Sequence, residues 1–504
     1  RFQKAEVAYL GWNDEAALEA CRPVLKESPW RYEAWQLQFR VWKRRADRLA
    51  SQGDLSGRDA AIREADEALA QTLSVARCDP QVLVEQADWV LEKTGLGMKT
   101  EAAKLLEETL AICDRALAID PTNLRALQRR SEAHWRTSSD LRDSGQDFTG
   151  HMNLAIADGE TAVRLAPKDG RARLILGRAL LLKVQQQLLR GGTDEEALAR
   201  ASEELDAAQR LAASDDVALP MTLSYARYLQ AEAARQRGLD PRGFLRQAVE
   251  ASESFAHMSP NDPSACGGLG ELLKESAMAE RRAGGDPAAL LQRSQASFER
   301  GVAVAPGSAQ LLKDLGSVHR LLAQAAVDRH LDPNTELRLA AGLFDKAEAL
   351  RPKFAETHQE RGASALVAAR WAELQGGDPS TELKEAQSRF RLARTYNAQD
   401  AELAESLAET AWLQARWEAR QRRNPAARVA EGLAAAATAL KLNPRQHRAR
   451  ALAGALRLVR AQAGGSAAEA DAAAQDLEVA FTKDPMLAVE FGELVKQAKA
   501  LRPG

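Results

Sequence analysis

The 504-residue sequence has little of what sheets, membrane spans or secretion signals require. Aromatic residues make up 5% of the chain, and Ala, Leu, Arg and Glu, which favour packed helices, dominate it. The richest apolar stretch, 174–184, is interrupted by Arg178 and Lys183, so we expect no transmembrane helix. The first residues also lack the apolar core of a secretory signal. We interpret Arg1 as an internal position of a longer protein and residues 500–504 as a natural end.

Cysteines are few, and the net charge is small. The four cysteines lie far apart and form no Cys-x-x-Cys pair: Cys21, Cys78, Cys113 and Cys266. We therefore expect neither a disulfide framework nor a thiolate zinc site, and a reducing cytoplasm fits. Sixty-nine basic residues against 71 acidic ones leave a formal charge of −2. Such a chain has no global field to attract nucleic acid or an anionic membrane, and we expect neither as a partner.

Prolines that follow apolar helix tails recur along the chain at a fixed period. From Pro167 onward, steps of 46 or 47 residues lead to Ala213, Pro260, Pro306, Pro352, Ala398 and Pro444. The series extends less evenly on both sides, where the marks are Pro29, Pro80, Pro121 and Pro485. A fixed period of this length is typical of a solenoid, and eleven marks predict about eleven repeats.

A second turn lies 19 residues before each regular mark. The turns read Gly-Leu-Asp-Pro241, Gly-Gly-Asp-Pro287, Leu-Asp-Pro333, Gly-Gly-Asp-Pro379 and Arg-Asn-Pro425. Glycine can end one helix in the left-handed conformation, Asp or Asn can cap the next helix, and proline suits its first position. Each repeat is therefore predicted to be a helix A, a tight turn and a helix B. After Pro306 these helices would span 308–330 and 333–350, and both are amphipathic.

Small and aromatic residues recur at fixed distances from the marks. Leu315-Gly316 follows one mark, and Phe298 and Gly301 precede Pro306. This order of leucine-glycine, alanine, phenylalanine, alanine and proline resembles the tetratricopeptide repeat (TPR) over nearly the whole chain. The usual TPR has about 34 residues, and the extra residues here would lengthen helix A. The resemblance implies an all-α, right-handed α-solenoid of about eleven TPR-like hairpins.

The regularity of the repeats predicts three regions. Irregular TPR-like repeats would occupy 1–120, regular 46-residue repeats 121–485, and a C-terminal capping helix 486–504. The capping helix would cover the last open helix face, because Leu487 and Phe491 recur on one side of it. We therefore expect a monomer.

No catalytic or cofactor-binding motif stands out. The sequence has no glycine-rich kinase loop, no His-Arg-Asp motif and no Asp-Phe-Gly motif. Segment 94–100 has the wrong glycine-to-lysine spacing for a phosphate-binding loop, so we interpret it as a helix-ending turn. The seven histidines lack metal-ligand spacing, and Cys21 and Cys113 take the core position of Phe298. We predict no catalytic centre, no cofactor and no metal.

Long-helix repeats with Gly-Asp-Pro turns and an Ala- and Arg-rich composition resemble the C-terminal halves of bacterial eukaryotic-type serine/threonine protein kinases. The leading hypothesis is a protein-protein interaction scaffold, the regulatory or partner-recruiting arm of such a signalling protein. The alternatives are the repeat arm of an enzyme such as a glycosyltransferase, and a standalone TPR adaptor.

In the TPR family helix A faces the concave side of the solenoid, and many of the corresponding positions here are charged. The candidate peptide-binding groove residues are Arg40, Lys43, Arg44, Arg125, Arg136, Arg171, Arg178 and Arg227. Near the other end the same positions give Glu402, Glu405 and Glu409. The alternative interpretation is a set of solvated helix faces. If the basic residues line one surface, they favour acidic or phosphorylated protein segments, because arginine offers paired donors to carboxylate and phosphate.

Overall fold

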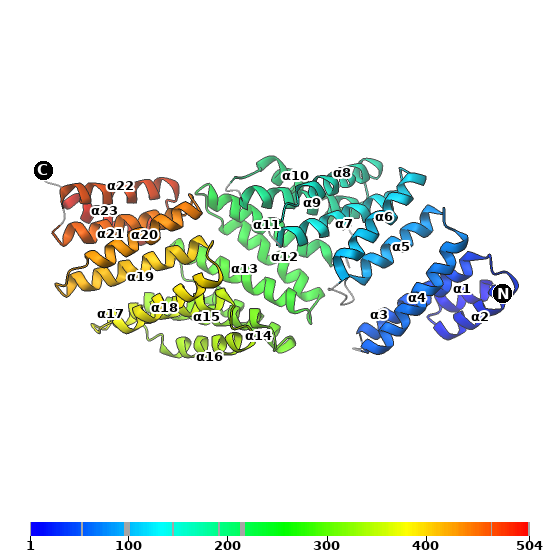
Figure 1. The fold of residues 1–504 in the computed structure, drawn as a ribbon, viewed down its shortest axis with the longest axis horizontal. Helices are drawn as coiled ribbons and strands as arrows, with labels where there is room; N and C mark the ends of the chain where they lie inside the picture. Colours follow the sequence, from blue (N-terminus) through cyan, green and yellow to red (C-terminus); the bar gives the residue numbers. More distant parts are fainter. Residues whose placement is uncertain are drawn as a thin grey trace. The chain divides into compact units, whose positions relative to one another are not determined.

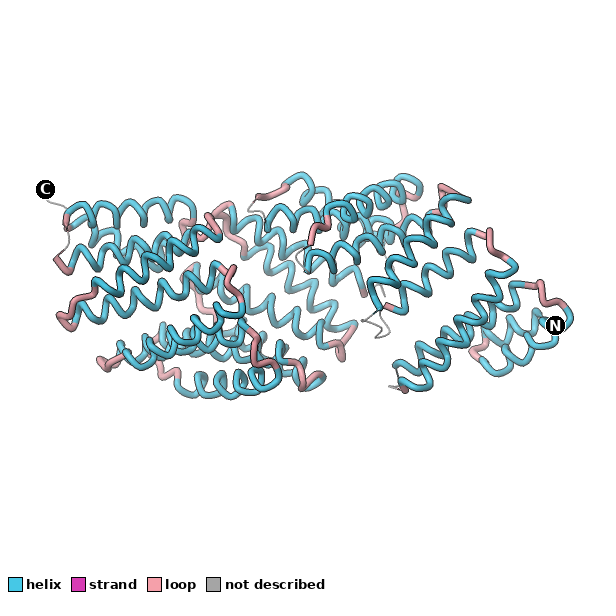
Figure 2. Tube along the Cα trace, viewed as in Figure 1, coloured by secondary structure: helices cyan, strands magenta, loops and turns pink. Residues whose placement is uncertain are grey.

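The computed structural model is all-helical. It describes residues 2–51, 54–94, 101–143, 146–189, 192–211, 217–464 and 466–501. Within these ranges the chain forms 23 α-helices and no strand (Figure 1). Short turns join most of the helices (Figure 2). None of the described helices is both long enough and apolar enough to span a bilayer.

The first of two compact units comprises residues 1–187 and 194–214. Its helices pair in chain order as α1 (Phe2–Leu10), α2 (Asp14–Glu27), α3 (Tyr32–Ser51), α4 (Leu55–Val75), α5 (Pro80–Lys93), α6 (Ala102–Ile119), α7 (Leu124–Asp143), α8 (Thr149–Leu165), α9 (Gly170–Leu189) and α10 (Glu195–Leu211). Helices α3 and α4 pack along each other, as do α5 with α6 and α7 with α8. Helix α7 also packs on both α5 and α6, so successive hairpins stack.

The second unit comprises residues 188–193 and 215–504. Its helices are α11 (Ala218–Gln236), α12 (Arg242–Met258), α13 (Pro263–Arg282), α14 (Ala288–Val304), α15 (Ala309–Asp328), α16 (Asn334–Leu350), α17 (Ala355–Leu374), α18 (Ser380–Tyr396), α19 (Ala401–Arg420), α20 (Ala426–Leu442), α21 (His447–Gln462), α22 (Ala467–Lys483) and α23 (Leu487–Ala500). From α13 onward each odd-numbered helix contacts the next odd-numbered helix, and each even-numbered helix packs on the odd-numbered helices before and after it. The described chain thus contains eleven hairpins and a final helix, which confirms the predicted all-α fold.

The tight turns inside the hairpins use one repeated backbone conformation. Positive φ angles occur at Gly238 (70°), Gly284 (82°) and Gly376 (73°), spaced by 46 residues or twice that number. His330 and Arg422 occupy the equivalent position in two other hairpins. They adopt φ of 59° and 54° although each carries a side chain. Glycine enters this region at no steric cost, whereas an L side chain pays about 1 kcal/mol or more.

Aspartate or asparagine caps the helix that follows each of these turns. The Oδ1 atom of Asp286 accepts a hydrogen bond from the amide of Ala288 at 3.0 Å, and Asn424 does the same for Ala426 at 2.9 Å. The intervening prolines, such as Pro287, occupy the N-cap position, one residue earlier than the predicted first helical position. The capping role predicted for the acidic residue is confirmed.

The core is built where a small residue of helix A faces an aromatic ring of helix B. A Cβ atom added to Gly316 would lie 2.5 Å from the Phe344 ring, and one added to Gly362 would lie 2.7 Å from the Phe390 ring. Both rings are fully buried. Where the small residue is Ser131, its hydroxyl instead donates to a carbonyl of α8 at 2.7 Å. The prediction that helices approach closely at the series of small residues is therefore confirmed at these positions.

Helix α23 covers the end of the second unit. Leu487 and Phe491 are buried, and Leu494 and Val495 are partly buried against the same core cluster. Its lysines face outward. The interpretation of this helix as a cap of the last hairpin is consistent with these contacts.

Candidate partner-binding surface

Seven of the eight candidate groove residues lie on odd-numbered helices of the first unit. Helix α3 carries Arg40, Lys43 and Arg44, helix α7 carries Arg125 and Arg136, and helix α9 carries Arg171 and Arg178. The eighth, Arg227, belongs to α11 in the second unit, where it donates to Gln230 of the same helix at 3.0 Å.

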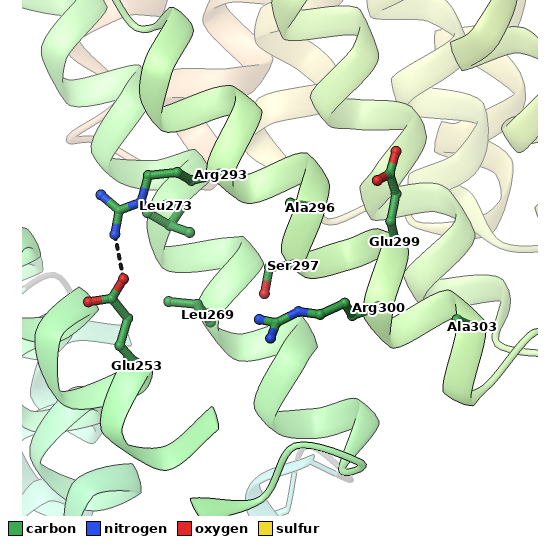
Figure 3. Close-up of a pocket in the computed structure, with 9 residues that line it drawn as sticks. All are labelled: Glu253, Leu269, Leu273, Arg293, Ala296, Ser297, Glu299, Arg300 and Ala303. Carbon is green, nitrogen blue, oxygen red and sulfur yellow. Dashed lines mark hydrogen bonds and ion pairs between the residues drawn. The ribbon is translucent and has the colours of Figure 1, made fainter. Parts of the chain in front are cut away.

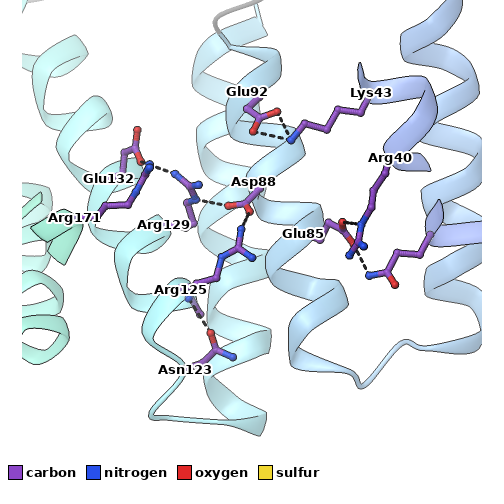
Figure 4. A network of polar contacts seen from close by, with 12 residues as sticks. Arg40, Lys43, Glu85, Asp88, Glu92, Asn123, Arg125, Arg129, Glu132 and Arg171 are labelled. Carbon is purple, nitrogen blue, oxygen red and sulfur yellow. Dashed lines mark hydrogen bonds and ion pairs between the residues drawn. The ribbon is translucent and has the colours of Figure 1, made fainter. Parts of the chain in front are cut away.

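The α3 side chains are held by acidic residues of neighbouring helices. Arg40 pairs with Glu85 of α5 at 2.6 Å, and Lys43 pairs with Glu92 at 2.6 Å (Figure 4). These pairs lie at the surface and contribute about 1 kcal/mol or less each.

Arg44 is a structural residue of the first two hairpins. It pairs with the buried Asp14, donates to the Tyr9 carbonyl at 3.0 Å, and stacks over the rings of Tyr9 and Trp12. Because its side chain is largely buried by these contacts, Arg44 offers little of its charge to a partner.

Helices α7 and α9 carry the other four candidate arginines, of which Arg125 and Arg171 are seen beside the carboxylates of Asp88 and Glu132 (Figure 4). Asp88 of α5 accepts from Arg125 and from Arg129. Glu132 of α7 accepts from Arg129 and Arg136, both at 2.9 Å.

Helix α9 adds two more arginines to this cluster. Arg171 reaches Glu132 at 3.4 Å, and the guanidinium of Arg178 lies 3.7 Å from the Trp135 ring centroid. Burial alone would raise the pKa of the Glu132 carboxyl, but Arg136, Arg129 and the α9 arginines keep it below its usual value. Glu132 is thus a fixed anion at the centre of a cationic surface.

We name this set the α5–α7–α9 arginine cluster, and define it by Arg125, Arg129, Arg136, Arg171 and Arg178 with Asp88 and Glu132. Five cations face two anions, so the cluster keeps a local positive excess although the chain is nearly neutral. Half or more of the side chain of Arg125 and of Arg171 is exposed. A ligand carrying several anionic groups would compete for these donors.

Sequence reasoning identified the basic half of this surface and missed the rest. Arg129 lies outside the positions carried over from the TPR family, and Asp88 comes from an irregular repeat. Glu132 does occupy a carried-over position, eleven residues after Pro121, and its charge in the middle of an arginine-rich helix was the available signal.

Near the C-terminal end of the second unit, one arginine is surrounded by several carboxylates of the odd-numbered helices. Arg448 donates to Glu405 at 3.1 Å, to Glu409 at 3.0 Å and to Glu490 at 2.7 Å. Burial alone would raise the pKa of Glu409, but Arg448 and Arg370 lower it to about 2. The acidic positions predicted at this end of the chain are therefore occupied by carboxylates that share one arginine, and Glu402 stands beside them with a pKa raised by burial.

Two of the thiols have core environments. Cys21 and Cys113 are buried, and burial raises the pKa of Cys21 to about 11 and that of Cys113 to about 12. A protonated buried thiol is a poor nucleophile. Within the described ranges no three His, Cys, Asp or Glu side chains come together as a metal site would require. Most of the glycine-rich segment 94–100 lies outside the described residues.

A hollow of about 550 Å³ lies over α13, between α12 and α14 (Figure 3). Leu269 and Leu273 form its floor, and Glu253 and Arg293 pair across one side at 2.5 Å. Arg300 and Glu299 lie on the other side, so charges of both signs surround the hollow. This balance gives it no preference for either sign of ligand.

No protein-family model matches the sequence, and no curated protein matches it. Among solved structures, the human IFIT1 dimer with PPP-AAAA is similar at 16% identity over 87% of this chain and 89% of that one, with a TM-score of 0.40. A thermophilic TPR protein of Thermus thermophilus is similar at 22% identity over 48% and 99%, with a TM-score of 0.33. YrrB, described as a TPR protein with an unusual peptide-binding site, is similar at 13% identity over 49% and 95%, with a TM-score of 0.30.

Proposed function

We propose that this chain is a protein-interaction scaffold whose first unit binds acidic or phosphorylated protein segments. The observation that carries the proposal is the α5–α7–α9 arginine cluster, in which five guanidinium groups face two carboxylates across three adjacent helices. A planar guanidinium offers two parallel donors, which match a carboxylate or a phosphate. A surface that spans several hairpins suits an extended or helical segment better than a small molecule.

A finer proposal concerns the biological setting. We propose a regulatory or partner-recruiting role in a larger cytoplasmic signalling protein, with a bacterial serine/threonine kinase as the leading candidate. The support is the resemblance in repeat style and composition described above. A glycosyltransferase arm and a standalone adaptor are the alternatives. The coding sequence on both sides of the chain discriminates among the three.

A direct test uses a fluorescent peptide of alternating glutamate and phosphoserine, with a glutamine and serine peptide as its neutral counterpart. We expect fluorescence anisotropy to show binding of the anionic peptide only. Binding should weaken as salt rises, because the screening length falls from about 10 Å at 0.1 M to about 3 Å at 1 M.

The variant that tests the surface is Arg171→Glu with Arg178→Glu. It should lower peptide affinity at least about tenfold, a loss of about 1.4 kcal/mol, without changing the helical circular dichroism signal. The matched control is Arg115→Glu with Arg164→Glu, which reverses two exposed arginines on α6 and α8. Equal affinity of both double variants would exclude the arginine cluster as the binding surface.

A further inference from the structure

A second pocket lies at the C-terminal end of the second unit, where α19 turns into α20. Its volume is about 780 Å³, within the range of sites that hold small ligands or several side chains. The C-terminal half of α21 and the capping helix α23 close its other sides. Trp412, Leu458 and Leu494 give it an apolar wall, and Trp412 is itself buried apart from the face toward the pocket.

The rim of this pocket is cationic. Arg416, Arg420, Arg422 and Arg423 all line it, and none of the lining residues is acidic. Glu373 of α17 pairs with Arg416 at 2.6 Å and also with Arg420. Asp378 also lies near enough to Arg423 for the two charges to attract each other, so two carboxylates stand beside four guanidinium groups.

Three of these arginines retain unused donors. The Nε atom of Arg416 is buried and has no hydrogen-bond acceptor. The guanidinium groups of Arg422 and Arg423 form no hydrogen bond or ion pair with the described part of the chain. A buried donor without an acceptor is costly, so an anionic ligand at this rim would gain from satisfying it.

Arg422 also occupies a backbone position that other repeats give to glycine. Its φ of 54° matches the left-handed angles of Gly238, Gly284 and Gly376 at the equivalent turns. An arginine in this conformation is strained, and its side chain lines the pocket.

We propose that this pocket binds an acidic segment of a partner protein through one large apolar side chain and the anionic groups beside it. The apolar side chain would pack on Trp412 and Leu494, and the adjacent carboxylates or phosphates would accept from Arg416, Arg422 and Arg423. The proposal rests on the segment-binding function proposed above, but it concerns a separate site in the other unit with its own sequence requirement.

The test uses blocked peptides and isothermal titration calorimetry. The probe is Glu-Glu-Phe-Glu-Ser, and its counterparts replace either the phenylalanine by alanine or each glutamate by glutamine. We expect the probe to bind the pocket of the second unit more tightly than the arginine cluster of the first, and each counterpart to bind this pocket about tenfold more weakly or worse. A version with phosphoserine in place of the glutamates beside the phenylalanine separates phosphate from carboxylate as the preferred anion.

The decisive variant is Arg422→Gly. It should raise the thermal midpoint, because glycine relieves the left-handed strain, and it should weaken binding of the probe about fivefold or more. The matched control is His330→Gly, which relieves the same strain at the equivalent turn of another hairpin and should leave binding unchanged. A more stable Arg422→Gly protein that binds the probe as well as the original chain would overturn the proposal.

Two further arms keep the two proposals distinct. Arg171→Glu with Arg178→Glu, in the first unit, should leave binding of the phenylalanine probe to the pocket unchanged while it lowers affinity for the glutamate and phosphoserine peptide at least about tenfold. A 5′-phosphorylated oligoadenylate serves as a competitor, since stacked bases and arginines also suit single-stranded RNA. If this RNA binds the pocket more tightly than the probe does and displaces it, the pocket is assigned to nucleic acid instead of protein.

Discussion

One charge cluster in each unit, both on odd-numbered helices, can be compared directly, and the two have inverse arrangements. In the first unit one carboxylate, Glu132, is shared by three arginines, whereas in the second unit one arginine, Arg448, is shared by three carboxylates. The hairpins beneath them follow the same plan. A repeat backbone therefore leaves the sign of its exposed helix face open, and a few residues at repeated positions set that sign.

A second inversion concerns one pair of equivalent positions. In the first unit His134 and His151 lie with their Nδ1 atoms 2.9 Å apart, while in the second unit the corresponding pair is His319 and Glu336, at 2.7 Å. Each pair joins the two helices of one hairpin across the same spacing. One hairpin thus pairs two imidazoles, and the other pairs an imidazole with a carboxylate.

The largest effect is expected from overpacking the shared helix contact. Gly316→Leu should destabilise the second unit by about 3 kcal/mol, because even a Cβ atom would lie 2.5 Å from the Phe344 ring. Gly177→Leu in the first unit should cost less, since its neighbour is the flexible end of Leu205. Urea denaturation of both variants measures the difference.

A control for this comparison lies in the same hairpin. Gly342 on α16 has open space around its Cβ position, so Gly342→Leu should raise stability by several tenths of a kcal/mol through helix propensity. If Gly316→Leu and Gly342→Leu melt alike, the contact between glycine and phenylalanine does not limit packing here.

The next largest effects are expected from removing the central charge of each cluster, Glu132 in the first unit and Arg448 in the second. Glu132→Gln leaves clustered arginines and Arg448→Gln leaves clustered carboxylates, and each should cost about 2–3 kcal/mol at neutral pH. The two losses should respond differently to acid. Carboxylates without Arg448 take up protons at higher pH, so the loss in Arg448→Gln should shrink between pH 7 and pH 5, whereas the loss in Glu132→Gln should persist because arginine does not titrate there.

The original chain supplies the reference for that experiment. Glu409 has a folded pKa of about 2 against 4.5 in the unfolded chain, so it stabilises the fold above about pH 4.5 and this contribution is lost as the pH falls towards 2. Denaturation midpoints from pH 7 to pH 3 measure all three proteins. Parallel pH profiles for the two variants would contradict the inversion.

A smaller effect is expected at the histidine pair. Burial first, and then His151, lower the pKa of His134 from 6.5 to about 4. The unfolded chain therefore binds a proton between these values that the folded chain does not, and stability should fall by about 2–3 kcal/mol as the pH drops from 6.5 to 4. His151→Glu, which copies the partner of His319, should raise the His134 pKa and flatten this slope.

The control for the histidine prediction is His257→Gln, which removes an exposed histidine of α12. It should leave the slope between pH 6.5 and pH 4 unchanged. A slope that survives His151→Glu in full would place its origin elsewhere in the molecule.

The smallest effects are expected where exposed pairs decorate either unit. Lys43→Ala breaks the pair with Glu92 in the first unit, and Lys499→Ala breaks the pair with Glu478 in the second. Each should cost under about 0.5 kcal/mol, because water screens the charges and the side chains regain freedom. A loss above about 1 kcal/mol for Lys43→Ala alone would show that the first unit depends on surface pairs more than the second.

Local chemistry made much of the fold predictable. The proline marks, the Asp-Pro turns and the series of small residues predicted eleven hairpins, and helix α16 begins and ends within one residue of the predicted 333–350. One repeated interaction escaped notice. The side chains of Trp35, Arg173 and His358, each six residues after a mark, hydrogen-bond to the carbonyl of the marking proline. Their chemical types differ, so no residue pattern signals the shared role.

The sequence by itself determined the repeat, the class of fold and the sign of charge on each helix face, because capping, turn geometry and helical periodicity act within a few residues. Tertiary structure alone decided which charges meet. Arg129, Glu132 and Arg171 come from two hairpins. Arg422 and Leu494 line the same pocket only because α23 packs against the last hairpin. Distances between side chains on successive hairpins are set by packing over tens of residues, which no local pattern records.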